Sequence, residues 1–374
     1  MIWAFLILFV TYFFCMMAVV YGFSKVSFFS SEEIPPSTRF SVVISFRNEA
    51  ENLPNMLGTI ETLKYPSELF EIIFVNDASE DTSEAIVFAA IQKSKFSIKL
   101  IQNKRISHAP KKDAISEAIK TSNFEWIVTT DADCELPQLW LKTLDLFIQN
   151  KNSVMVCGPV IYESYGGFIE NFQQLDGLSL QAVTVGSFGF GNPNLCNGAN
   201  LAYSKEAFLK VKGFSGNNHI ASGDDIFLME KMKEVFPKQV RFLKSKEAIV
   251  STKPQFTWKK IISQRIRWAS KTSKQKNVVS IMLGILVFLM SISILALPFF
   301  MVFDSENLGF YMLLAAFKII IDYNVVYRTA LFFNKKISFW KFLWQPFVYA
   351  AIILVVVFGS LRGNYLWKGR SYKN

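Results

Sequence analysis

Two aspartates, Asp131 and Asp133, stand one residue apart at the end of an apolar run that begins at Trp126. Side chains alternate along an extended strand, so both carboxylates are expected on the same side, where the strand ends. Two oxygen ligands suit Mg²⁺ or Mn²⁺, because these ions keep open positions for phosphate oxygens and water. The spacing therefore predicts a divalent cation that holds a diphosphate, with a turn or a helix cap as the alternative.

The strand that carries this pair is one of a series in which strands and helices alternate. We predict strands at residues 40–45, 70–75, 98–101 and 126–130, and helices at residues 53–60, 83–91 and 111–120. Repeated β-α units predict an α/β fold with a mostly parallel sheet and flanking helices. Ligands gather at the carboxyl ends of such strands, and Asp77 follows the second strand there.

Apolar segments at both ends of the chain predict membrane helices. The chain is 51% hydrophobic and 19% charged, which is too apolar for an ordinary soluble protein. Residues 1–24 contain no charged side chain and predict an N-terminal transmembrane anchor, with a removed signal peptide as the alternative. Residues 278–361 hold about three further apolar segments. Lys318 and Asp322 lie one turn apart in the second of them and are expected to pair, with a direct catalytic role as the alternative.

The distribution of basic residues predicts the orientation. From Lys253 to Lys276 there are eight Lys or Arg and no Asp or Glu, so residues 257–276 are expected to form an amphipathic helix at the cytoplasmic membrane surface. Residues 35–256 are then expected to form a cytoplasmic domain. The whole chain is expected to be an integral protein of a bacterial inner membrane.

The basic tail, residues 362–374, conflicts with this orientation. After three spans the tail would lie outside, so either one apolar segment does not cross or the tail departs from the positive-inside tendency. The net charge of +10 is concentrated beside the membrane segments, where it suits anionic lipid headgroups. We therefore expect membrane lipids as partners and no nucleic acid.

Several motifs stand in an order that resembles a membrane-bound family 2 glycosyltransferase with a GT-A fold. The resemblance covers nearly the whole length and rests on Ser41–Glu49, Phe74–Asp81, Thr130–Asp133 (D-x-D), Ser222–Asp225 and Gln264–Trp268 (Q-x-x-R-W). One departure is Ala78, which replaces the glycine that usually follows the first aspartate and is expected to constrain the turn.

The resemblance implies roles for individual residues. Asp77 would contact the nucleoside, Asp131 the ribose or nucleotide, and Asp133 the divalent metal, Mg²⁺ or Mn²⁺. Asp225 stands at the position of the catalytic base, and Asp224 takes the place of the usual glutamate. The resemblance further implies a donor side with Glu49, Lys112 (or its neighbour Lys111), Gln264, Arg267 and Trp268, and an acceptor side with Gly198 and Asn200.

These roles imply an inverting, metal-dependent transferase that moves a sugar from a nucleotide-sugar, expected to be UDP-linked, to a lipid-linked or glycan acceptor at the cytoplasmic face. A processive polysaccharide synthase is an alternative, because Q-x-x-R-W also occurs in chain-elongating members of the family. A further alternative is a non-catalytic membrane scaffold that keeps a degenerate nucleotide-sugar fold.

Overall fold

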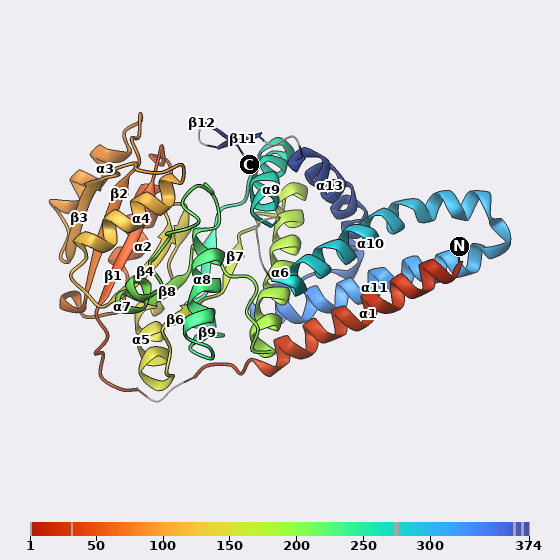
Figure 1. Cartoon of the computed structure of the whole chain (residues 1–374), viewed down its shortest axis with the longest axis horizontal. Coiled ribbons are helices and arrows are strands. Elements are labelled where there is room, and N and C mark those ends of the chain that lie inside the picture. Colours follow the sequence, from red (N-terminus) through yellow and green to blue (C-terminus); the bar gives the residue numbers. More distant parts are fainter. Residues whose placement is uncertain (1, 31–32, 273–276, 362–363, 368–369, 374) are drawn as a thin grey trace.

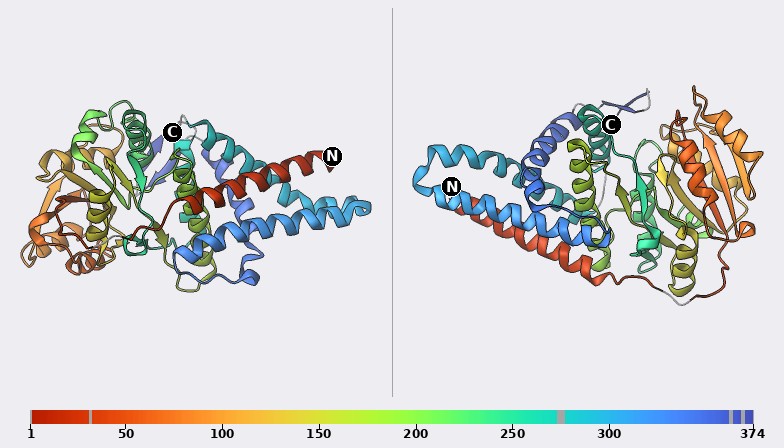
Figure 2. Two further views of the ribbon diagram at one scale, coloured as in Figure 1. Left: turned by 90° about the horizontal axis from the view of Figure 1, so that it is seen from below. Right: turned by 180° about the vertical axis from the view of Figure 1, so that it is seen from behind.

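An α/β domain and a bundle of long helices lie next to each other along the long axis of the molecule (Figure 1). The computed structural model describes residues 2–30, 33–272, 277–361, 364–367 and 370–373. The N-terminus lies at the far end of the bundle, whereas the C-terminus lies between the bundle and the α/β domain (Figures 1 and 2).

A seven-stranded sheet forms the centre of the α/β domain. Its order is β3 (Ser97–Gln102), β2 (Phe70–Asn76), β1 (Phe40–Phe46), β4 (Trp126–Asp131), β8 (Leu201–Ser204), β6 (Met155–Cys157) and β9 (Val240–Phe242). Strands β3, β2, β1 and β4 are parallel, and β8 is antiparallel to both β4 and β6. The predicted mostly parallel sheet is confirmed. Its central strands are apolar runs because helices cover both faces.

The helices of the domain follow the predicted alternation. They are α2 (Leu53–Glu61), α3 (Ser83–Ile91), α4 (Pro110–Thr121), α5 (Trp140–Asn150), α7 (Lys205–Lys210) and α8 (Asp224–Val235). A small second sheet joins β5 (Cys134–Glu135), β10 (Val250–Thr252) and β7 (Val160–Tyr162). Since β5 directly follows Asp133, this sheet connects the D-x-D segment to the part of the domain that faces the bundle.

Four helices are long and apolar enough to cross a membrane, one N-terminal and three C-terminal, as predicted. They are α1 (Ile2–Lys25), α10 (Val278–Phe303), α11 (Leu308–Phe332) with the turn before it, and α13 (Gln345–Ser360) together with the short α12 (Phe339–Phe342). The pairing of Lys318 with Asp322 is confirmed, and the Tyr12 hydroxyl of α1 donates a hydrogen bond to Asp322 at 2.6 Å. This triad joins α1 to α11 and satisfies polar groups that would be costly in an apolar bundle.

Helix α6 (Phe168–Gly189) joins the α/β domain to the bundle and was not predicted. It lies along α1 with the two backbones in direct contact. A Cβ atom built on Gly189 would stand 1.9 Å from the carbonyl oxygen of Gly22, and one on Gly186 would stand 2.8 Å from that of Val19. Glycine is therefore required on α6 for this close helix packing.

The predicted amphipathic segment forms helix α9 (Trp258–Thr272), and residues 273–276 lie outside the described residues. Helix α13 packs along α9 and α10. The tail contains a hairpin of β11 (Asn364–Trp367) and β12 (Arg370–Lys373). Arg370 forms an ion pair with Asp77, so the tail lies against the α/β domain.

Candidate functional site

The centre of the site is Lys111, which lies between two of the predicted carboxylates. Its Nζ is 2.6 Å from Oδ1 of Asp131 at the end of β4, and 3.5 Å from Oδ2 of Asp224 at the start of α8. Burial opposes the charge of Lys111, but the carboxylates outweigh it and raise the pKa of this lysine above its ordinary value. Asp131 and Asp224 are 93 residues apart in the sequence, and the fold brings both to the ammonium group of Lys111.

Asp225 lies in the same group, in the first turn of α8. Its Oδ2 accepts a hydrogen bond from the backbone N–H of Gly198 at 3.3 Å, and its Oδ1 accepts one from Ile226 at 2.7 Å. Gly223 precedes the helix with a φ of +84°, a conformation that glycine adopts without strain, and it turns the chain so that the helix begins at these aspartates. The N-terminal end of a helix favours carboxylates, so the charge of Asp225 is stabilised there.

The loop before β8 brings Gly198 to the carboxylates. Because β8 is antiparallel to β4, this loop meets the carboxyl end of β4, where the Thr129 hydroxyl donates to the carbonyl oxygen of Gly198 at 2.8 Å. A Cβ atom on Gly198 would stand 3.1 Å from Oδ2 of Asp224 and 3.5 Å from Nζ of Lys111. Backbone at Gly198 therefore forms one wall of the site.

Asn200 is placed differently from the expectation for an acceptor-side residue. Its side chain is 1% exposed and makes three hydrogen bonds, with Trp140 Nε1 at 3.0 Å and the carbonyl oxygens of Pro159 at 2.9 Å and Ala248 at 2.8 Å. Gly198 faces the carboxylates, whereas Asn200 holds the loop from behind. Asn200 is thus a positioning residue in this structure.

Lys112 is also placed away from the carboxylates. It is 1% exposed, and its Nζ donates to the carbonyl oxygens of Asn217 at 2.7 Å and Ile220 at 2.9 Å. Adjacent residues on a helix differ by about 100° in direction, which explains why Lys111 and Lys112 point to different places. Lys111 therefore contacts Asp131 and Asp224, whereas these bonds of Lys112 hold the segment before α8.

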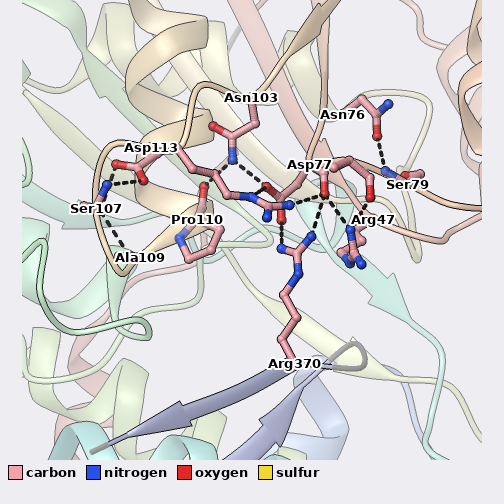
Figure 3. Close-up of polar contacts among 12 residues, drawn as sticks. Arg47, Asn76, Asp77, Ser79, Asn103, Ser107, Ala109, Pro110, Asp113 and Arg370 are labelled. Atoms are coloured by element: carbon pink, nitrogen blue, oxygen red, sulfur yellow. Dashed lines mark hydrogen bonds and ion pairs between the residues drawn. The ribbon is translucent and has the colours of Figure 1, made fainter.

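Asp77 forms a second polar centre at the carboxyl end of β2 (Figure 3). Its Oδ1 accepts from Arg105 Nε at 2.6 Å and from Asn103 Nδ2 at 2.7 Å, and its Oδ2 accepts from Arg370 Nη1 at 2.7 Å. The carbonyl oxygen of Asp77 also accepts a hydrogen bond from Arg47 Nη1 at 3.1 Å. Asn103, Arg105 and Arg370 were not predicted from the sequence.

The turn after Asp77 bears out the expected constraint. Ala78 has a φ of +54°, a left-handed conformation that glycine adopts readily and alanine only with strain. The carbonyl oxygen of Ala78 accepts a hydrogen bond from Arg47, which fixes the turn. In the loop after the neighbouring strand β1, the Glu49 carboxylate accepts from Asn52 Nδ2 at 2.7 Å, and the Glu49 N–H donates to Ser83 Oγ at 2.8 Å.

The second sheet connects Asp133 to the Q-x-x-R-W helix through Tyr162. The Tyr162 hydroxyl lies 3.4 Å from Oε1 of Gln264 on α9. Burial raises the pKa of Tyr162 to about 12. The negative charge of Asp133 also raises this pKa, and the positive charge of Arg267 lowers it. Tyr162 therefore contacts the α9 motif and lies within the electrostatic reach of Asp133; it was not predicted from the sequence.

Arg265 anchors α9 to α6. Arg265 forms an ion pair with the buried Asp176, and its guanidinium stands 4.3 Å from the ring centre of Trp268. Since Arg265 is fixed to α6 in this way, the helix holds Gln264 towards Tyr162.

The acidic residues suit a divalent cation that enters together with a diphosphate. Among the described residues no group of three His, Cys, Asp or Glu side chains forms a ready-made metal cage. Mg²⁺ is commonly held by one or two carboxylates plus substrate phosphates and water. Asp131 and Asp133, with oxygen donors only and both partly exposed at the end of β4, fit that chemistry.

Comparisons with known proteins agree with this architecture. Residues 41–211 match the family model of glycosyl transferase family 2. Poly-beta-1,6-N-acetyl-D-glucosamine synthase of Staphylococcus epidermidis is 27% identical over 153 residues, which are 37% of this chain and 36% of that protein. Glycosyltransferase AglE of Haloferax volcanii is 24% identical over 189 residues, 50% of this chain and 58% of that one. The matched segments thus span about a third to just over half of these relatives.

A solved structure with the same fold is that of the mannosyltransferase PcManGT from Pyrobaculum calidifontis in complex with GDP-Man and Mn²⁺. It superimposes with a TM-score of 0.57 at 15% sequence identity, over 96% of this chain and 99% of that one. The family match covers the strands that carry Asp77, Asp131 and Asp133, and the superposition extends over the membrane helices. Residues 41–211 thus form a glycosyl transferase family 2 domain, the fold is GT-A-like, and four helices are candidate membrane spans.

Proposed function

We propose that the protein transfers a sugar from a nucleotide-sugar donor to a hydroxyl group of a membrane-associated acceptor, with inversion at the anomeric carbon. The observation that carries the proposal is the convergence of Asp131, Asp224 and Asp225 around Lys111 at the carboxyl end of the sheet. This group offers a cation for a leaving diphosphate and a carboxylate for the acceptor proton. The same small group of residues can thus stabilise the leaving diphosphate and accept the proton of the acceptor.

In the proposed reaction Asp225 accepts the proton of the acceptor hydroxyl as its oxygen attacks the anomeric carbon. General-base catalysis of this kind contributes about 10²–10⁴-fold. The bond from the sugar to the diphosphate breaks on the opposite face, and Lys111 stabilises the negative charge that develops on the leaving group. Asp224 holds Lys111 in place and does not need to contact the sugar.

Asp131 and Asp133 would hold the divalent cation, which neutralises the diphosphate when it is bound. PcManGT, the structural neighbour, was solved with Mn²⁺. The nucleoside would lie at Asp77, with Glu49 on the adjacent strand end. We propose a uridine nucleotide on the resemblance, and the GDP-Man of PcManGT makes a guanosine nucleotide the donor to test beside it.

The acceptor would approach from the bundle, at the cytoplasmic face of a bacterial inner membrane. Support comes from the aromatic side chains where α6, α9 and the start of α13 meet: Phe168 and Trp344 have ring centres 4.1 Å apart, and Phe172 and Trp258 have ring centres 5.3 Å apart. Trp and the basic residues of α9 favour the membrane interface. Gln264, Arg267 and Trp268 would lie between this aromatic group and the donor.

The test is the release of nucleoside diphosphate by the full chain in membranes, supplied with UDP-N-acetylglucosamine or GDP-mannose and with Mn²⁺ or Mg²⁺. Asp225→Asn and Asp133→Ala are each expected to lower the rate at least about 10²-fold. Glu206→Gln, which changes an exposed carboxylate of α7, is the matched control and is expected to keep the wild-type rate. Unchanged turnover in both site variants would end the proposal.

A processive polysaccharide synthase is the second candidate, because the relative from Staphylococcus epidermidis is a poly-beta-1,6-N-acetyl-D-glucosamine synthase. Product length distinguishes the two. A single sugar added per acceptor, seen by mass spectrometry of the lipid fraction, supports the first function, and a ladder of lengths on a gel supports the second.

A further inference from the structure

The C-terminal hairpin reaches across the molecule to the nucleoside end of the site. Arg370 of β12 lies 293 residues from Asp77 in the sequence, and its Nη1 is 2.7 Å from Oδ2 of that carboxylate. A second bond runs from Arg370 Nη2 to the carbonyl oxygen of Asp77 at 3.3 Å. Figure 3 shows Arg370 entering this centre from the hairpin, on the side opposite Asn103.

The partners of Asp77 fall into two groups by origin. Asn103 and Arg105 follow β3, the strand next to β2, and both bind Oδ1. Oδ2 accepts its hydrogen bond from Arg370, which comes from outside the α/β domain. Asn103 and Arg105 therefore belong to the α/β domain itself, whereas the hydrogen bond of Arg370 to Oδ2 depends on the position of the C-terminal hairpin.

The hairpin is not part of the larger sheets. In the described part of the chain its strands pair with each other and with no strand of the two larger sheets. A two-stranded hairpin alone is marginally stable. Besides its packing against α9, the hairpin is held to the α/β domain through Arg370, whose side chain is 21% exposed. Asp77, which is 7% exposed, offers its second oxygen to any donor that can replace the guanidinium.

We propose that the C-terminal hairpin competes with the nucleotide for Asp77, with Arg370 occupying the carboxylate oxygen that an N–H donor of the nucleobase would otherwise bind. This inference rests on the proposed function, because it takes Asp77 as the nucleoside contact. The hairpin then acts as a latch that is closed without donor and opens when donor binds. A latch that is closed most of the time lowers the apparent donor affinity by the fraction of molecules that are open.

Nucleotide affinity of the full chain tests the latch. Calorimetry with UDP and with GDP, each with Mn²⁺, is carried out on the wild type, Arg370→Gln and Arg241→Gln. Arg241 lies partly exposed on β9, where its Nε donates to the carbonyl oxygen of Asn152, so its variant controls for the lost charge. We expect Arg370→Gln to bind the nucleotide about three- to tenfold more tightly than the wild type, and Arg241→Gln to bind like the wild type.

Deuterium uptake of residues 364–373 gives a readout without turnover. The latch predicts higher uptake in the wild type once nucleotide is added, and equally high uptake in Arg370→Gln without nucleotide. Weaker or unchanged nucleotide binding by Arg370→Gln, in a wild type that does bind nucleotide, would overturn the latch alone. Absence of nucleotide binding in all three proteins would instead overturn the proposed function.

Discussion

Two acidic centres lie at the same edge of the sheet, and basic groups compensate their negative charge to different extents. Asp77 is 7% exposed and is contacted by Arg105 and Arg370, so each of its oxygens faces a guanidinium. Asp131 is 39% exposed and shares a single ammonium, that of Lys111, with Asp224. The first centre has positive charge in excess, and the second has more carboxylates than cations.

This difference indicates a division of labour. A carboxylate held by several fixed donors is pre-organised to recognise a rigid group such as a nucleobase. A group of carboxylates around one lysine can accept a metal ion or a proton during the reaction. Substitutions at the first centre should therefore change affinity, and substitutions at the second should change rate.

The largest effect is expected for Lys111→Met. Without the ammonium, Asp131 and Asp224 repel the diphosphate that the site must stabilise, and turnover should fall about 10²-fold. Nucleoside diphosphate release at saturating donor measures this loss, and Lys111→Arg should restore part of it. A rate within a factor of two of the wild type would show that Lys111 only holds the apo structure together.

Asp77→Asn is expected to weaken nucleotide binding about 10- to 100-fold, because the amide keeps the shape and loses the charge that faces two guanidinium groups. The rate at saturating donor should stay within about threefold, since a lost binding contact raises KM without changing kcat. Calorimetry and a donor titration provide the two values. A fall in kcat with normal affinity would reverse the assignment of the two centres.

Lys112→Met tests the neighbouring lysine, which contacts neither centre in the bonds described above. Its loss leaves the buried carbonyl oxygens of Asn217 and Ile220 without this donor, and the free energy of unfolding should fall by about 1–3 kcal/mol. Thermal unfolding in detergent measures the change. A large loss of nucleotide affinity in a protein that stays folded would instead return Lys112 to the donor side.

The smallest effect concerns pH. The pKa of Lys111 is raised above its ordinary value of 10.5, so the stability that it contributes is complete below that value and is lost only as the pH rises through the higher, folded-state pKa. The difference in melting temperature between the wild type and Lys111→Met should therefore stay constant from pH 7 to about pH 10. A difference that shrinks over this range would show that Lys111 loses its proton early.

The sequence predicted the part of the fold that depends on local pattern. The first four strands are short runs rich in β-branched and aromatic residues that end in polar residues, and the helices between them carry apolar side chains at helical spacing. The structure agrees with these bounds to within one or two residues. The same local signals placed Asp77, Asp131 and Asp133 at strand ends.

Contacts between distant parts of the chain could not be predicted from the sequence. Lys111 and Lys112 are adjacent and chemically identical, and only the rotation of α4 decides which one meets Asp131. Helix α6 mixes buried polar residues such as Gln173 and Asp176 with apolar ones, because it faces both the domain and the bundle, and this blurs its amphipathic pattern. Arg370 gave no signal, since its partner lies 293 residues away.

The contact of Arg370 with Asp77 also has a topological consequence. A chain that leaves one face of a bilayer and returns to it must cross an even number of times, and α9 and the tail both adjoin the α/β domain. Helices α10 and α11 run together to the end of the bundle that holds the N-terminus (Figure 1), which accounts for one passage out and one back. The last candidate span, Phe339–Ser360, is also long enough to cross by length and composition. If the bundle sits in a bilayer, this span must therefore begin and end on the same face, so that Arg370 can reach Asp77 on the side of the α/β domain.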